Sequence, residues 1–208
     1  MILWNLVKGL ATKPRHLPAN VAKERPMVPP GSGKIKLHIG GTERKEGWKI
    51  LDAIDSDVVD FVGNVADLSR FPDAYCEEIY ASHVMEHIGQ QDFLATLKGI
   101  HRILASDGVF YFSVPDLEVL CKLFLDQRLE TAQRFHVMRM MFGGQTDTFD
   151  FHHIGLSHEF MLDFFQGAGF GEVRRVESFG LFDDTSDYKP YGVAISLNLI
   201  ARKFPVTG

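Results

Sequence analysis

The fold is decided by five stretches between Lys34 and Asp116, which read KIKLHIGG (34–41), WKILDAI (48–54), FVGNVADL (61–68), EEIYASHVMEHI (77–88) and HRILASDGVFYFSVPD (101–116). Each is a short apolar run followed directly by small, acidic or polar residues. This pattern is typical of parallel strands whose carboxyl ends line a crevice for a nucleotide-like ligand. It predicts an α/β fold with its chemistry at the carboxyl edge of the sheet.

From residue 34 onward, strands and helices are predicted to alternate. We expect strands at 34–39, 48–53, 58–62, 77–81 and 108–113, with two more inside 172–179 and 192–202. Helices are expected at 90–104, 117–126, 129–142 and 157–167, and glycines follow the last two, as is common at helix ends. The predicted fold is a Rossmann-like, doubly wound, mostly parallel seven-stranded sheet. It has a C-terminal antiparallel strand pair and helices on both faces.

Residues 1–33 differ in composition from the rest and are predicted to form a helix and a proline-rich basic arm. This segment holds five of the nine prolines, and five basic residues against one acid. The domain proper is expected to span 34–208. Short amphipathic helices of this kind pack on their own domain or touch a membrane surface or partner, and the first is the expectation here.

Charge and cysteine content narrow the possible functions. The whole chain carries −5, so the part after the basic arm carries −9, which argues against a nucleic-acid partner and favours small substrates. Cys76 and Cys121 show no paired spacing, so neither a disulfide framework nor a CxxC zinc site is expected. No apolar run approaches the roughly 20 residues of a membrane span. A cytoplasmic protein without stable membrane insertion is predicted, and the oligomeric state is left open.

Several strand-ending residues have the chemistry that a nucleoside needs. Gly40 and Gly41 let the backbone approach a ligand, and Asp52 suits two ribose hydroxyls. Asp52 follows Gly41 by only 11 positions, where a dinucleotide site has about 20, so no crossover helix fits and an NAD fold is disfavoured. In the next block Asn64 and Asp67 are candidate acceptors for an adenine amino group.

The string HVMEH (83–87) also matches the inverted zinc-peptidase motif H-x-x-E-H. On a helix, His83 and His87 would bind zinc, with Glu86 as the base and Glu159 as a distant ligand. The string follows a predicted strand directly and lies among the blocks of the nucleotide crevice. We therefore expect no metal, and a zinc hydrolase is kept as an alternative.

Several of these blocks resemble the class I S-adenosylmethionine-dependent methyltransferases, in particular the small predicted enzymes of the methyltransferase type 11 group. ASHVMEHI (81–88) is similar to the SHVLEH segment that follows the fourth strand in that group. HRILASDGVFYFSVPDLE (101–118) resembles the RVLKPGGxLxxSVPDLE stretch, with Ser106-Asp107 in place of the usual Pro-Gly. Residues 37–52 and 141–179 resemble the truncated first motif and the GGQ…FHxxGF tail. The resemblance covers 34–180 and implies an enzyme that binds S-adenosylmethionine.

The resemblance also implies a role for each matching position. In the family, the cofactor's methionine portion, ribose, adenine and sulfonium contact successive strand ends. Asn64 stands where the family usually has an aspartate. The implied contacts are Gly40 and Gly41 for methionine, Asp52 for ribose, Asn64, Asp67 and Leu68 for adenine, and Ser82 and His83 for the sulfonium end.

Methyl transfer to a hydroxyl is helped by removal of the acceptor's proton, and histidine is the commonest base in enzymes. His152 and His153 lie between two predicted helices, and His83 lies at the crevice mouth. These three are the candidate catalytic residues. We expect transfer to oxygen or nitrogen of a small-molecule or saccharide-type acceptor. The alternative is a catalytically silent partner protein that binds an adenosyl ligand, which Asn64 and the short glycine motif favour.

Overall fold

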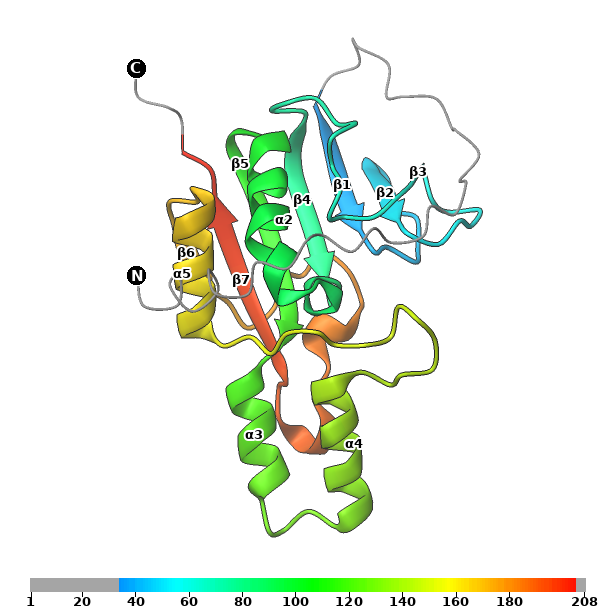
Figure 1. Ribbon diagram of the computed structural model, residues 1–208, viewed down its shortest axis with the longest axis vertical. Helices are drawn as coiled ribbons and strands as arrows, with labels where there is room; N and C mark the ends of the chain where they lie inside the picture. Colours follow the sequence, from blue (N-terminus) through cyan, green and yellow to red (C-terminus); the bar gives the residue numbers. More distant parts are fainter. Residues whose placement is uncertain (1–33, 205–208) are drawn as a thin grey trace.

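A seven-stranded mixed sheet forms the centre of the computed structural model, which describes residues 34–204 (Figure 1). The strand order is β3-β2-β1-β4-β5-β7-β6. The first five strands pair in parallel, and β7 pairs antiparallel with both β5 and β6. The predicted fold class is confirmed. The strands are β1 (Ile35–Ile39), β2 (Trp48–Asp52), β3 (Phe61–Val62), β4 (Cys76–Ser82), β5 (Leu104–Pro115), β6 (Val173–Arg175) and β7 (Ser196–Arg202).

Four α-helices are present among the described residues, close to the predicted positions. They are α2 (Gln90–Ile103), α3 (Leu117–Leu125), α4 (Thr131–Phe142) and α5 (His158–Ala168). The glycine stop signals act as expected, since α4 ends before Gly143 and α5 ends at Gly169, whose φ of 96° is left-handed. The predicted N-terminal helix and arm (1–33) lie outside the described residues. No helix in residues 34–204 is long and apolar enough to span a membrane.

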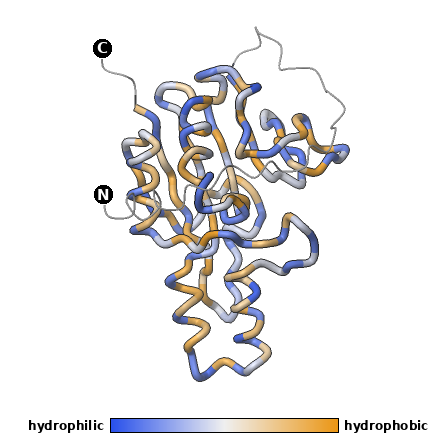
Figure 2. The backbone as a smooth tube through the Cα atoms, in the orientation of Figure 1, coloured by the Kyte–Doolittle hydropathy of each residue, from blue (hydrophilic) through white to orange (hydrophobic). Residues whose placement is uncertain are grey.

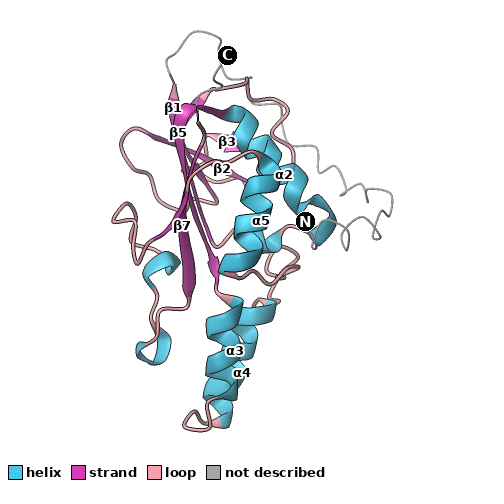
Figure 3. Ribbon diagram, turned by 90° about the vertical axis from the view of Figure 1, so that its left-hand side faces the viewer, coloured by secondary structure: helices cyan, strands magenta, loops and turns pink. Residues whose placement is uncertain are grey.

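Only one face of the sheet carries α-helices in the described part of the chain, so the expectation of helices on both faces was wrong there. Helices α2 and α5 lie side by side on this face (Figure 3). The opposite face is covered by residues 176–195, where Phe179 and Phe182 pack against Tyr80 with ring centroids 5.6 and 4.6 Å apart. The physical reason is the short β1–β2 connection, residues 40–47, which contains no helix.

The main core lies between the sheet and helices α2 and α5. Apolar and polar residues mix along both helices, while the inner strands are mainly apolar (Figure 2). Phe93, Leu97 and Phe165 are fully buried against the strands. Each such side chain contributes about 1.5–3 kcal/mol to folding by leaving water.

Helices α3 and α4 form a separate lobe beyond the carboxyl ends of β4 and β5 (Figure 1). The lobe has its own small apolar cluster, made of Leu120, Leu123, Val137 and Ile195. Asp116 joins the lobe to the sheet. Its Oδ1 accepts hydrogen bonds from the first-turn amides of α3, and its Oδ2 lies 2.7 Å from Arg175 Nη2. A capped, ion-paired junction of this kind fixes how the lobe projects over the sheet edge.

His38 is buried on the face that lacks α-helices. Its ring contacts Tyr80 and Phe182 at centroid distances of 5.0 and 4.2 Å, and Nδ1 has no hydrogen-bond partner among the described residues. Burial lowers the pKa of His38 to about 4. The folded protein therefore keeps this ring neutral at neutral pH.

Replacing His38 by phenylalanine is expected to make the protein less sensitive to acid. The unfolded chain binds this proton near pH 6.5 and the folded chain near pH 4. Above pH 6.5 the His38 ring is neutral in both states, and it does not reduce stability. As the pH falls from 6.5 to about 4, the unfolded chain gains a proton that the folded chain does not, so the free energy of unfolding falls by up to about 3 kcal/mol. Urea unfolding at about pH 7.5 and 4.5 measures this difference. His153→Phe changes an exposed histidine and should lose as much stability between the two pH values as the wild type does. An equal loss in His38→Phe would show that His38 does not cause the acid sensitivity.

Candidate functional site

The topology brings the predicted cofactor residues to one edge of the sheet. Gly40 follows β1, Asp52 ends β2, Asn64 follows β3 by two residues, and Ser82 ends β4. Because β3, β2, β1 and β4 are adjacent and parallel, their carboxyl ends line up on the same side (Figure 1). Connections leave β1 and β4 toward opposite ends of the sheet, and ligands of such folds bind at this switch point.

Two separate constraints require a glycine at position 40. Its φ is +74°, and a Cβ built on it would lie 2.3 Å from Val84 Cγ2. The amide of Gly40 donates to Leu51 O at 2.8 Å, so the backbone turns tightly at the end of β1. Gly41 has a different neighbour, because its Cβ would lie 2.7 Å from Nδ1 of the buried His38. Its small size is needed for packing beneath the turn.

The polar residues after β2 and β3 are held by local hydrogen bonds. Asp52 Oδ1 accepts from the amide of Ile54 at 2.7 Å, which fixes the carboxylate at the strand end. Asn64 Oδ1 accepts from the amide of Ala66 at 2.9 Å, so its NH₂ group is the part left for a ligand. An asparagine held this way offers a donor where the family's usual aspartate offers an acceptor.

Asp67 and Leu68 differ in their availability. Asp67 is exposed, and hydrogen bonds from the Ser69 side chain and backbone lower the pKa of its carboxyl, so it is an ionised acceptor. Leu68 is only 4% exposed and belongs to the main core, and its carbonyl accepts from Arg102 at 2.7 Å. Its side chain is therefore occupied by packing.

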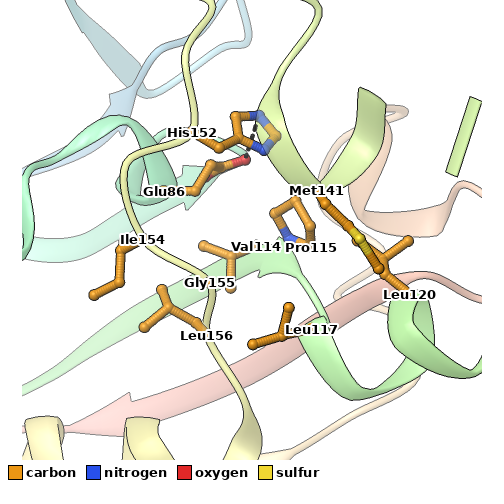
Figure 4. A pocket seen from close by; sticks show the side chains of 10 residues that line it. All are labelled: Glu86, Val114, Pro115, Leu117, Leu120, Met141, His152, Ile154, Gly155 and Leu156. Atoms are coloured by element: carbon orange, nitrogen blue, oxygen red, sulfur yellow. Dashed lines mark ion pairs between the residues drawn. The ribbon is translucent and has the colours of Figure 1, made fainter. Parts of the chain in front are cut away.

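The other half of the site is a cluster around Glu86, which lies in the 3₁₀ turn Met85–His87 directly after β4. Glu86 is 2% exposed, and neither carboxylate oxygen has a hydrogen bond within the described residues. Its Oε1 lies 3.4 Å from His83 Nδ1 and 3.9 Å from His152 Nε2 (Figure 4 shows the second contact). Burial alone would raise the pKa of Glu86, but His83, with His87 and His152, lowers it.

His83 is held in place from the side opposite Glu86. It adopts a φ of +52°, and its Nε2 lies 2.9 Å from Ser196 Oγ. Ser196 Oγ donates its only proton to Thr185 O at 2.9 Å, so it must accept the Nε2 proton of His83. The Nδ1 of His83 thus faces Glu86 either with a lone pair or with a second proton. Ser196 is buried and committed to Thr185, so its role is to orient the imidazole.

The neighbouring histidines of the predicted pair point in different directions. His152 has an 11% exposed side chain and faces Glu86, and burial lowers the pKa of its imidazole. His153 is exposed, and its ring stacks on Phe151 at an interplanar angle of 15°. Its amide donates to Glu86 O at 2.8 Å, which ties the segment to the turn after β4. The structure therefore unites His83 with His152 and leaves His153 outside the cluster.

Two hollows meet at His152 beneath the α3–α4 lobe. Glu86 and His152 are the only polar side chains among the residues that line the first hollow (Figure 4). The second is lined by residues of α4 and of the Gly143–Gly144 turn, including His136 and Arg139. The first hollow has a volume of about 10 Å³, room for about one water molecule, whereas the second has about 400 Å³ and is large enough for a small molecule. The apolar lining of the first hollow includes Val114, Pro115, Leu117, Leu120, Met141 and Ile154.

The layout of a zinc peptidase is not formed. That motif needs His83 and His87 on one helix, but only Met85–His87 is helical and His83 lies in the left-handed region. Glu159, the expected distant ligand, is exposed near the start of α5.

Sequence reasoning missed Ser196, which orients His83. Its position follows from the register of β7, in which Ser196 lies opposite Pro115 at the end of β5. The signal in the sequence is weak: Ser196 and Asn198 are polar residues at alternate positions of an apolar strand. Both face residues 176–195, where Ser196 donates to Thr185 O and Asn198 donates to Ser186 O.

Comparison with known proteins decides the family. A family model described as a methyltransferase domain matches residues 29–170. The chain belongs to this methyltransferase family. No curated protein matches it. The S-adenosylmethionine-dependent methyltransferase from Archaeoglobus fulgidus is a similar solved structure, with 15% identity and a TM-score of 0.51 over 82% of this chain and 86% of that one.

Two further solved structures are similar in fold. The 1,6-didemethyltoxoflavin-N1-methyltransferase of Burkholderia thailandensis, solved with its acceptor and S-adenosylhomocysteine, is 15% identical with a TM-score of 0.51, over 83% of this chain and 72% of that one. The CMeT domain of the citrinin polyketide synthase is 14% identical with a TM-score of 0.50, over 83% of this chain and 47% of that one. At these identities the likeness shows the fold alone.

The match to the methyltransferase model confirms the predicted family, and the similar solved structures confirm the predicted fold. S-adenosylmethionine is the cofactor of this family. The chain spans 50% of the CurJ carbon methyltransferase chain and 63% of a Bordetella parapertussis protein described as a possible exported protein.

The close approach at Gly40 is expected to show in a matched pair of substitutions. Gly40→Ala and Gly47→Ala both place alanine at a positive φ, +74° and +79°, but only Gly40 has a neighbour within 4 Å. Gly47→Ala should cost about 1–2 kcal/mol from backbone strain. Gly40→Ala should cost about 1–3 kcal/mol more, because the methyl overlaps Val84.

A double-mutant cycle in urea separates the two causes. In a Val84→Ala background, Gly40→Ala should cost no more than Gly47→Ala, since the overlapping methyl is gone. An equal cost of Gly40→Ala in both backgrounds would show that Val84 is not the constraint.

Proposed function

We propose that the protein transfers the methyl group of S-adenosylmethionine to an oxygen or nitrogen atom of a small-molecule or saccharide-type acceptor that binds beside Glu86 and His152. The observation that carries this proposal is the position of the Glu86 cluster. It directly follows β4 at the cofactor edge and opens into a mostly apolar hollow. Cofactor-side and acceptor-side groups thus meet at the end of one strand.

The residues at the sheet edge suit the cofactor. Gly40 removes side-chain bulk where the backbone must approach the ligand, and the fixed carboxylate of Asp52 can accept from two ribose hydroxyls. Asn64 offers an amide donor and Asp67 an ionised acceptor beside the adenine position. When bound, S-adenosylmethionine supplies a positively charged sulfonium with a methyl group ready for transfer.

The rest of the chemistry belongs to the chain's own residues. The larger hollow beside α4, which His152 also lines, has room for the acceptor, and binding there would align the acceptor's nucleophilic atom. His152 lines both hollows and is neutral near pH 7 because burial lowers its pKa. The buried carboxylate of Glu86 stabilises positive charge that develops beside it. We assign activation of the acceptor to the Glu86 cluster as a unit, and give His153 no part in it.

Asp52→Ala is expected to abolish cofactor binding. Calorimetric titration of the wild-type chain with S-adenosylmethionine and with S-adenosylhomocysteine should show micromolar binding of both. The variant lacks the carboxylate that we assign to the ribose, so its affinity should fall at least about 100-fold, the value of two charge-assisted hydrogen bonds. Asp57→Ala removes an exposed acid from the same loop and should bind normally. Undiminished binding by Asp52→Ala would overturn the assignment of the ribose site.

His152→Ala is expected to lose methyl transfer while keeping cofactor affinity. Formation of S-adenosylhomocysteine is measured with a panel of hydroxyl, amine and activated-carbon acceptors. Turnover of the active acceptor should fall about 10²–10⁴-fold, the usual contribution of an acid–base group. His153→Ala should retain the wild-type rate. Turnover of carbon acceptors alone would overturn the proposed transfer to oxygen or nitrogen. Equal losses of turnover in His152→Ala and His153→Ala would overturn the role proposed for His152.

A further inference from the structure

We propose that Glu86, His87 and His152 bind one divalent transition-metal ion of the Zn²⁺ type at the acceptor side of the site. Metal binding stands independently of the methyl transfer proposed above, whereas its role toward the acceptor rests on that function. The sequence pattern predicted no metal, and the peptidase motif that it contains would have used His83 and His87 as ligands. Here Glu86 is itself a ligand, and His152 comes from a distant segment.

The first observation is the convergence of three ligand atoms. One carboxylate oxygen of Glu86 and one ring nitrogen each of His87 and His152 lie within 4.8 Å of one another. Four ligands around Zn²⁺, with bonds of about 2.0–2.1 Å, lie about 3.4 Å apart. The cluster therefore needs only a small contraction of side chains to close on an ion. His87 and His152 also stack edge to face with centroids 4.9 Å apart, which holds both rings beside the carboxylate.

The second observation is that neither oxygen of the Glu86 carboxylate accepts a hydrogen bond from the described residues. A carboxylate that is 2% exposed and has no hydrogen bond to the described residues is costly to bury without a cation. The surrounding groups are three imidazoles, which are lone-pair donors when neutral. A divalent ion would satisfy the carboxylate and two rings at once. A proton on His83 Nδ1, 3.4 Å from Glu86 Oε1, is the competing source of positive charge.

The third observation is the orientation of His87. Its Nδ1 lies 3.1 Å from the carbonyl oxygen of Phe151, and a carbonyl can only accept, so Nδ1 carries the proton. Nε2 of the neutral ring is then free of a proton and able to bind a metal. Metal-binding histidines usually donate the other ring N–H to a carbonyl or carboxylate in this way, which fixes both tautomer and orientation.

The donor set selects the kind of metal. Two imidazoles and one carboxylate suit Zn²⁺, Fe²⁺ or Co²⁺, whereas Mg²⁺ and Ca²⁺ prefer oxygen ligands. Three protein ligands leave at least one position open, as in catalytic zinc sites. His152, one of the three ligands, also lines the larger hollow in which an acceptor would bind. Coordination at the open position would make an acceptor hydroxyl easier to deprotonate, which is how the cluster would activate it.

The test is metal binding by the untagged full-length chain after treatment with EDTA and removal of the chelator. Binding of Zn²⁺ is measured by calorimetric titration. Binding of Co²⁺ is measured by its visible absorption, which is stronger when the ion has four or five ligands than when it has six. We expect one equivalent of either metal per chain. Glu86→Gln, His87→Ala and His152→Ala should each weaken binding by more than about 100-fold, since even the loss of a group that hydrogen-bonds to a ligand costs 10–100-fold. His153→Ala, next to a ligand but outside the cluster, should bind as the wild type does.

Binding of S-adenosylhomocysteine is measured on every variant as a check of folding that does not depend on metal. If the wild type binds S-adenosylhomocysteine but neither Zn²⁺ nor Co²⁺, the metal site is overturned. A proton on His83 would then be the positive charge that balances the Glu86 carboxylate. One equivalent bound equally well by all three ligand variants would also overturn it. If the wild type binds one equivalent of metal, the three ligand variants lose it, and the wild type does not bind S-adenosylhomocysteine, the metal site is upheld. The same result would sink the proposed methyl transfer.

Discussion

The length of the connection between β1 and β2 is the constraint on which most of the structure depends. Residues 40–47 are too few for a helix, so the chain turns sharply at Gly40 and enters β2 at once. One face of the sheet is then left without a crossover helix at this point. Residues 176–195 cover it instead, and the same segment supplies Thr185, which fixes Ser196 and through it His83. A short loop beside the cofactor edge thus shapes the acceptor side as well.

Charge balance inside the site is the second organising feature. Glu86 is buried between β4 and segment 150–156, and every ionisable group in contact with it is an imidazole. Such a cluster has two ways to be stable: it holds protons, or it holds a cation. Under the proposed function, either state would help to remove a proton from a hydroxyl acceptor.

The sequence predicted elements that depend on local pattern and missed arrangements that depend on packing across the sheet. Strand ends, the stops at Gly143 and Gly169, and the absence of a β1–β2 helix follow from spacing alone. The separation of His152 from His153 follows from the alternation of an extended segment, but which of the two faces inward depends on how that segment crosses Glu86. The fit of Gly41 against His38, and the burial of Leu68, are properties of the folded core with no signature in the sequence.

The separate apolar cluster of α3 and α4 has a consequence for motion. The lobe shares few buried residues with the main core and is attached through Pro115, Asp116 and the segment that returns to Leu156. Cooperative units of this size can open with a free energy well below that of global unfolding. Amides of α3 and α4 should then exchange with solvent earlier than those of β4 and β5, which would open a route to the proposed acceptor side without disturbing the sheet.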